Sequence, residues 1–154
     1  MKGKKLELEP HNFRVNSDGW CKITVGGEEY LVNPQGDIWQ IIGEEADGEQ
    51  LFTWNAAMRE TKKAGKRMPA DEEFSKILKT EKDMPNLILA GYRLAGYRST
   101  DGSFHNRLAY AYFWSSLQYD ASSAWRRALY SGASTVYRHY DYKAYGFSVR
   151  CLKD

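Results

Sequence analysis

Apolar and polar residues alternate in short runs through the N-terminal third of the chain, and this pattern predicts β-structure. Residues 20–25 and 28–32 are two β-rich runs joined by Gly26-Gly27. A two-residue glycine link predicts a hairpin, because both turn positions need a positive φ. A further short strand is expected over residues 37–42. Residues 43–50, which are rich in acids and glycine, are predicted to form a solvated loop.

Two short helices are predicted in the middle of the chain. Thr53 can cap a helix that runs from about Trp54 to Ala64, and Gly65 is suited to end it. A second helix is expected from about Asp71 to Thr80. Its apolar residues recur at helical spacing, and the acids of its first turn suit the helix dipole. These apolar positions are Phe74, Ile77 and Leu78.

From residue 86 onward the pattern changes to short apolar and aromatic pieces separated by Gly, Ser and Asp. No segment there is long or periodic enough for a helix. Residues 112–114 and 146–151 are expected to be the last strands of the core. Between them lie about 30 residues with little regular pattern. A compact domain rarely leaves so long a segment unstructured unless it has a function.

Composition narrows the class of protein. The 154 residues, 42% of them apolar, suffice for a single domain over 1–154 that buries about two-thirds of its unfolded surface. A net charge of +2 argues against a nucleic-acid partner. No apolar run is long enough to span a membrane. Because the basic N-terminus is not followed by an apolar stretch, a signal peptide is not indicated and a cytoplasmic location is expected.

The chain has two cysteines, Cys21 and Cys151, which are too few for a disulfide framework and lack metal-ligand spacing. Each lies in an alternating apolar run, where a free Cys usually packs as a small hydrophobe. Buried, reduced thiols are therefore expected. A bridge that joins the two ends of the chain is the alternative.

Tyrosine is concentrated near the C-terminus: residues 118–145 hold six Tyr, against five in the other 126 residues. Ser, Gly, Asp, Arg and His are interspersed with them. This mixture is typical of an antibody paratope, where Tyr gives a large amphipathic contact at low entropic cost and the small polar residues adapt. The alternative is that these Tyr pack a β-surface. Few apolar residues interleave between Val136 and Tyr145, so exposure of Tyr137, Tyr140 and Tyr142 is favoured.

Three blocks of the sequence resemble one protein family. The first covers residues 52–57 and 65–74, and the second covers residues 95–98, 101–102 and 111–116. The third covers residues 124–125 and 136–138 and ends in Tyr145-Gly146-Phe147-Ser148-Val149-Arg150-Cys151. Together they resemble the Fibrobacter succinogenes major paralogous domain and the related variable proteins of diversity-generating retroelements. The resemblance extends over roughly residues 20–154.

The resemblance implies an α+β domain of the C-type-lectin fold, of the formylglycine-generating-enzyme type. Two helices are then expected beside a mixed, mainly antiparallel sheet, with a long loop-rich C-terminal half. The chain departs from the family pattern before Gly65, where a Cys that the family often has is missing. Ala70 replaces the usual Ser or Thr cap, which should weaken that helix start by about 1 kcal/mol.

For function, the resemblance implies a receptor-like variable protein that displays a diversified, Tyr-rich surface, at about residues 117–145, to a protein ligand. In such proteins selected Asn codons are randomised at their adenines, which excludes Trp, Lys, Glu, Gln and Met. Only Trp125 and Lys143 belong to the excluded types between Tyr119 and Tyr145. The expected binding surface comprises Tyr119, Asp120, Ala121, Ser123, Arg126, Ala128, Tyr130, Ser131, Gly132, Tyr137, His139, Tyr140, Asp141, Tyr142 and Ala144. The expected scaffold beneath it comprises Trp114, Trp125, Leu129, Val136, Phe147 and Val149.

Two other classes of protein remain as alternatives, a carbohydrate-binding module and a metal-dependent oxidase of the same fold. The oxidase uses an active-site Cys pair, which Cys21 and Cys151 do not match. No phosphate-binding loop or metalloprotease motif is present. The three histidines are scattered along the chain, and each is expected at the surface. We therefore expect a protein that is not an enzyme and needs no cofactor or metal.

Overall fold

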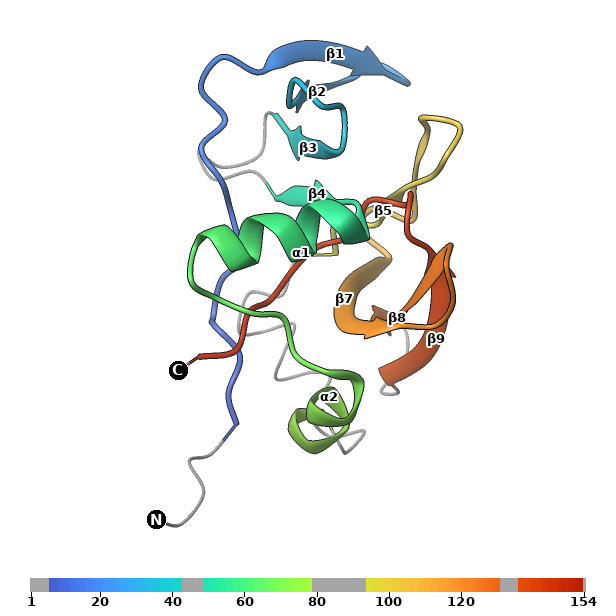
Figure 1. The fold of residues 1–154 in the computed structure, drawn as a ribbon. Helices are drawn as coiled ribbons and strands as arrows, with labels where there is room; N and C mark the ends of the chain where they lie inside the picture. The colour runs from blue at the N-terminus through green and yellow to red at the C-terminus, as the bar shows by residue number, and fades with distance from the viewer. Residues whose placement is uncertain (1–5, 43–48, 79–93, 131–135, 154) are drawn as a thin grey trace.

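The computed structural model describes residues 6–42, 49–78, 94–130 and 136–153. Four strands of the N-terminal half form one antiparallel sheet in chain order, at the top of Figure 1. These strands are β1 (Cys21–Val25), β2 (Glu28–Val32), β3 (Ile38–Ile41) and β4 (Gln50–Phe52). The predicted hairpin between β1 and β2 is confirmed, since Gly26 and Gly27 have φ of 57° and 83°.

The loop predicted at residues 43–50 lies mostly outside the described residues. Its last two residues contradict the prediction, because Glu49 and Gln50 are buried and Gln50 begins β4. The Gln50 side chain is held inside by hydrogen bonds: its Nε2 donates to the Val15 carbonyl and its Oε1 accepts from the Val15 amide. A polar side chain can be buried there because its donor and acceptor are both satisfied.

Both predicted helices are present. Helix α1 (Trp54–Lys63) is capped by Thr53, whose hydroxyl accepts a hydrogen bond from the Ala56 amide at 3.2 Å. Helix α2 (Asp71–Ile77) has no side-chain cap at Ala70. Instead the Glu73 carboxylate accepts from the Ala70 amide at 2.9 Å, which satisfies one N–H at the helix start. The helix ends at Ile77 rather than at Thr80, which lies outside the described residues.

The C-terminal half contains more regular structure than its sequence pattern predicted. Strands β5 (Tyr97–Arg98) and β6 (Phe104–His105) form a small antiparallel pair. Strands β7 (Tyr110–Gln118), β8 (Ser123–Tyr130) and β9 (Val136–Tyr142) form a three-stranded antiparallel sheet. The expectation of an irregular stretch between residues 114 and 146 was therefore wrong. β8 and β9 carry Tyr, Arg and His at positions where an ordinary strand alternates apolar with polar residues, so the period-two signal is lost.

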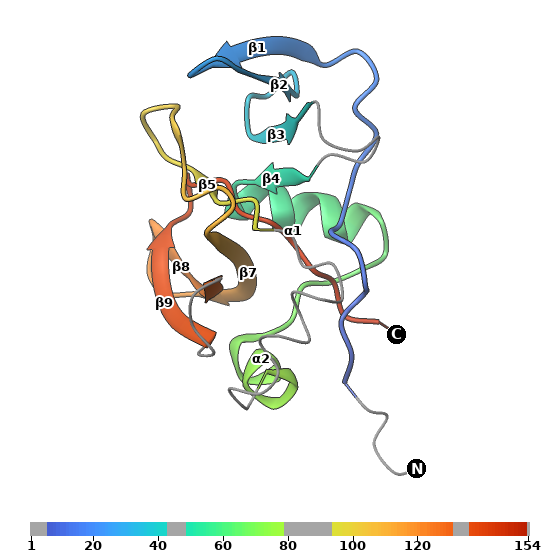
Figure 2. The same ribbon diagram turned by 180° about the vertical axis from the view of Figure 1, so that it is seen from behind.

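Residues 146–151 were expected to form a core strand. They instead connect the two larger sheets through isolated β-bridges. Phe147 exchanges both backbone hydrogen bonds with Phe52 on β4, at 2.8 and 2.9 Å, and the Ser148 amide donates to Tyr112 on β7 at 3.0 Å. Residues 146–152 are all buried. In Figures 1 and 2 this segment passes between α1 and the β7–β9 sheet. The resulting architecture is α+β, as predicted; the finer C-type-lectin assignment stays a prediction.

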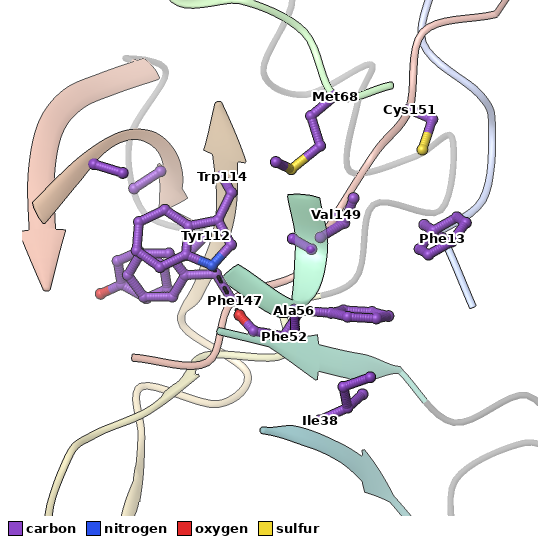
Figure 3. Close-up of a cluster of buried hydrophobic side chains, with 13 residues drawn as sticks. Phe13, Ile38, Phe52, Ala56, Met68, Tyr112, Trp114, Phe147, Val149 and Cys151 are labelled. Atoms are coloured by element: carbon purple, nitrogen blue, oxygen red, sulfur yellow. Dashed lines mark hydrogen bonds between the residues drawn. The ribbon is translucent and has the colours of Figure 1, made fainter. Parts of the chain in front are cut away.

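The main hydrophobic core lies between the two larger sheets and α1 (Figure 3). Trp114 is fully buried there, its ring centroid is 4.2 Å from that of Phe147, and its Nε1 donates to the Phe52 carbonyl at 2.8 Å. Leu129 and Val149 are buried as expected. Trp125, by contrast, is only partly buried, and its ring packs edge to face against Tyr119. Trp125 is therefore outside the main core, although it packs against Tyr119 and Tyr140 of the expected surface.

The two cysteines have different environments. Cys151 is buried in the main core, and burial raises the pKa of its thiol to about 11. Cys21 is exposed, contrary to expectation, because β1 is the edge strand of its sheet. Both thiols are free, so the alternative of a bridge between them is not realised.

Candidate functional site

The register of the β7–β9 sheet decides which side chains of the Tyr-rich region share a face. Successive residues of a strand point to opposite faces, so residues paired across the strands lie on the same one. Tyr112, Ala128 and Tyr137 are paired across the three strands. Two positions further along the strands, Arg126 is aligned with Trp114 and His139, and this row has the same orientation. Residues at the intervening positions point to the opposite face.

Two adjoining cavities open on this first face of the sheet. The larger has a volume of about 310 Å³ and the smaller about 160 Å³. They share three lining residues, Asn106, Tyr112 and Arg126. Together they form one depression, here called the tyrosine groove. The larger cavity is also lined by Tyr110, Ala128, Tyr137, Arg138 and His139, and the smaller by Tyr97, Asp141, Tyr145 and Phe147.

The wall of the tyrosine groove is a series of packed aromatic rings. Tyr110 stacks on Tyr130 and on Tyr112, with centroid separations of 4.7 and 5.4 Å. Tyr97 meets Tyr112 edge to face at 5.2 Å and also contacts Tyr145. Burial raises the pKa of Tyr97, Tyr112 and Tyr145, and for Tyr97 the nearby Asp141 and Asp101 carboxylates add to this effect. The hydroxyls therefore stay protonated at neutral pH and can donate hydrogen bonds.

The charged residues of the groove are Arg126 and Asp141. Arg126 donates from Nε to Asp141 Oδ2 at 2.7 Å, and its side chain is only 15% exposed. Its guanidinium carbon lies 5.3 Å from the centroid of the Tyr112 ring. A charged hydrogen bond and an aromatic neighbour both fix the orientation of the guanidinium group. The groove thus presents a positioned cation beside several hydroxyls.

Asn106 closes the groove at the side nearest β6. It has a φ of 60°, and its Nδ2 donates to the Tyr112 hydroxyl at 2.9 Å. The backbone around it packs directly on Gly96, where an added Cβ would lie 2.0 Å from the His105 carbonyl oxygen. Gly96 itself has a φ of 66°. Only glycine tolerates both the conformation and the close approach.

The opposite face of the sheet is held by helix α2. Asp71 accepts a hydrogen bond from Arg127 Nη1 at 2.5 Å and from Arg138 Nε at 2.9 Å. Burial alone would raise the pKa of Asp71, but the hydrogen bonds from the two arginines outweigh it and lower the pKa. Arg138 also lies 3.7 Å from the ring centroid of Trp125. This ion cluster fixes α2 against β8 and β9.

A second group of aromatic rings lies on this opposite face. Tyr119 and Tyr140 are stacked with parallel rings and a centroid separation of 3.8 Å. Trp125 meets both of them edge to face. The expected binding surface is therefore divided between two faces of one sheet rather than united on one.

The fifteen expected surface residues fall into distinct groups. Five line the tyrosine groove: Arg126, Ala128, Tyr137, His139 and Asp141. Tyr130 contributes to its wall, whereas Tyr119 and Tyr140 belong to the opposite face. Asp120, Ala121, Tyr142 and Ala144 are exposed outside the groove, and Ser131 and Gly132 lie outside the described residues.

Ser123 and Ala128 contradict the expectation of exposure, with 5% and 1% of their surface accessible. Both are on β8, the central strand of the sheet, so neighbouring strands cover them on both sides. Seven groove residues were not foreseen in this role: Tyr97, Asn106, Tyr110, Tyr112, Arg138, Tyr145 and Phe147. The alternating Tyr110 and Tyr112 were a usable signal, because a strand puts both side chains on one face.

Within the described part of the chain, no three His, Cys, Asp or Glu side chains gather in a way that could hold a metal ion. None of the helices there has the length and apolar character needed to cross a membrane.

Fold and site together define the class of protein: an α+β domain that carries an open, tyrosine-lined groove on a three-stranded sheet. The chain belongs to the Fibrobacter succinogenes major domain family, whose family model matches residues 3–153. No curated protein and no solved structure matches the chain.

Proposed function

We propose that this chain is a ligand-binding domain that engages a protein ligand through the tyrosine groove and the neighbouring exposed residues of β9. The observation that carries the proposal is the arrangement of Arg126, Tyr137 and His139. The pleat of β8 and β9 brings all three to one open cavity, where they meet Tyr110 and Tyr112. Aromatic anchors around a central cation are the residues on which binding energy concentrates in protein interfaces.

The dimensions of the groove favour a protein ligand. A cavity of about 310 Å³ is at the lower end for small-molecule sites, and it suits an inserted side chain. Tyr137, which lines the cavity, and Tyr142, which meets the groove residue Tyr145 edge to face, keep 43% and 57% of their surface accessible. Exposed Tyr of this kind gives contact area to a partner that rests on the groove rim.

A diversified surface on a C-type-lectin scaffold, as in the variable proteins of diversity-generating retroelements, is the finer form of the proposal. It is supported by the residue types permitted between residues 119 and 145 and by the place of Tyr137, His139 and Asp141, whose replacement would not disturb the main core. Sister copies of the gene should then differ at these three positions and keep Trp125. Substitutions spread evenly over the chain would contradict this form of the proposal.

Selection from a displayed library of random 12-residue peptides tests the binding function. Peptides enriched on the wild-type protein should bind the Tyr137→Ala variant more weakly, because this substitution removes one aromatic side chain from the groove lining. They should retain their affinity for Tyr119→Ala, which removes a comparable Tyr from the opposite face. A selection without specific binders, or binders that tolerate Tyr137→Ala, would contradict the proposal. A glycan array with the same variants would reveal whether a carbohydrate is bound instead.

A further inference from the structure

The guanidinium group of Arg126 is only partly satisfied by the protein. Its Nε donates to Asp141, but neither Nη1 nor Nη2 donates to any group in the part of the chain that the structure describes. The side chain is 15% exposed and lines both cavities of the tyrosine groove. A largely buried cation with unused donors is costly unless a partner or water takes them up. The two terminal nitrogens therefore mark a place where an acceptor fits.

The charges around the larger cavity favour an anionic acceptor. Its lining residues include Arg126, Arg138 and His139 but neither Asp nor Glu. Asp141 lines the smaller cavity, where it already accepts from Arg126. Asp71 is on the opposite face and is shared by Arg127 and Arg138. On the groove face Arg126 is matched by Asp141, and the unmatched guanidinium charge belongs to the pair that shares Asp71, of which Arg138 also lines the larger cavity.

The geometry of the two free donors of Arg126 indicates which type of anion fits the cavity. Nη1 and Nη2 of an arginine form a planar fork that matches the two oxygens of a carboxylate. Tyr110 and Tyr137 line the same cavity and can pack on the methylene groups that carry such a carboxylate. The protonated Tyr112 hydroxyl is a further donor nearby. A cavity of this size takes one acidic side chain of a protein ligand.

We propose that the larger cavity of the tyrosine groove binds an Asp or Glu side chain of the protein ligand, with its carboxylate on Nη1 and Nη2 of Arg126. This inference rests on the proposed binding function and adds to it the chemistry of the residue that is recognised. Arg126 is then the residue that determines specificity for an acid. Tyr110 and Tyr137 contribute affinity without that selectivity.

An array of nine-residue peptides tests the inference. Each random background is printed four times, with Glu, Gln, Lys or phosphoserine at the central position. Wild-type protein should bind the Glu member at least about tenfold more tightly than the Gln member, because a charge-assisted bidentate contact is lost with Gln. This comparison needs no protein variant, so it holds even where a substitution at Arg126 impairs folding.

Variants then assign the preference to Arg126. In Arg126→Gln the Glu and Gln members should bind equally, and Arg126→Lys should recover only part of the preference, because an ammonium lacks the fork. Arg59→Gln is the matched control: it removes one arginine charge from α1, outside the groove, and should leave the preference unchanged.

The possible failures are distinguishable. Peptides that depend on Tyr137 but bind equally with Glu and Gln would refute the acidic ligand and leave the binding function intact. Peptides that prefer Glu to the same extent in Arg126→Gln would refute the role of Arg126. Tighter binding of phosphoserine than of Glu would refute the carboxylate in favour of a phosphate. An array without any Tyr137-dependent binder would refute both the inference and the proposed function.

Discussion

Substitution of Asp71 tests whether the ion cluster on the face opposite the groove stabilises the β7–β9 sheet. Its carboxylate holds α2 on the sheet through Arg127 and Arg138, and its side chain is 13% exposed. Arg127 is 4% exposed, so the pair with Asp71 is almost entirely removed from water. Arg138 is 45% exposed and its bond should contribute little, about 0.5 kcal/mol. Asp71→Asn keeps the shape of the side chain and removes its charge.

The expected loss can be worked from the remaining partners of Arg127. Breaking a buried ion pair by removing one partner costs about 3–5 kcal/mol, because the other charge stays buried. Arg127 keeps a 2.9 Å bond to the Asp71 carbonyl and a 2.7 Å bond to Ser75, and the asparagine oxygen can still accept one bond. We therefore expect a smaller destabilisation of about 2–3 kcal/mol at pH 7.

The pH dependence gives an independent check. Folding lowers the pKa of Asp71 below its ordinary value of 3.8. Such a carboxylate stabilises the folded state at pH values above the unfolded pKa, and the contribution is lost as the pH falls through the folded pKa. The difference between wild type and Asp71→Asn should thus be constant near neutrality and shrink below about pH 4.

Urea unfolding from pH 7 to pH 3 measures both quantities. Glu72→Gln is the matched control, because it removes one acid from the same helix turn and so changes the same helix-dipole interaction. It should cost less than about 1 kcal/mol. If Asp71→Asn were no more destabilising than Glu72→Gln, the reasoning on the ion cluster would be refuted. A difference from wild type that persists unchanged at pH 3 would refute the electrostatic explanation.

Three further outcomes are expected. Phe147→Ala should lower the free energy of unfolding by about 3–5 kcal/mol, because it leaves a cavity at a fully buried site. Tyr137→Ala should change it by only about 0.5 kcal/mol, because Tyr137 is exposed. Equal losses for the two variants in urea unfolding would contradict the division between core and groove. Gly96→Ala should cost more than about 2 kcal/mol, since its Cβ would meet the His105 carbonyl at a positive φ, and a near-neutral effect would show that the backbone there can yield. Iodoacetamide should label Cys21 in the folded protein well before Cys151, and a reductant should leave the melting temperature unchanged; equal labelling rates by peptide mapping would contradict the burial of Cys151.

Local signals in the sequence were sufficient for the first half of the fold. The Gly26-Gly27 hairpin and the Thr53 cap depend on interactions between residues at most a few positions apart, so a short window of sequence contains them entirely. The same holds for α2, where Phe74 and, directly after the helix end, Leu78 are buried at helical spacing. The three sequence blocks, of which the last ends at residues 145–151, together indicated the family, whose model matches residues 3–153.

The tyrosine groove was decided by tertiary structure. Its residues come from β5, the segment before β7, the strands β7 to β9 and the segment after β9, and the face on which each strand residue lies depends on the register between strands. A shift of one residue would exchange Tyr137 and His139 for Arg138 and Tyr140 at the groove. Exposure was decided in the same way: Ser123 is buried because its strand is central, and Cys21 is exposed because its strand is at an edge. The sequence by itself determined which side chains were present for binding, and the pairing of distant strands determined which of them meet.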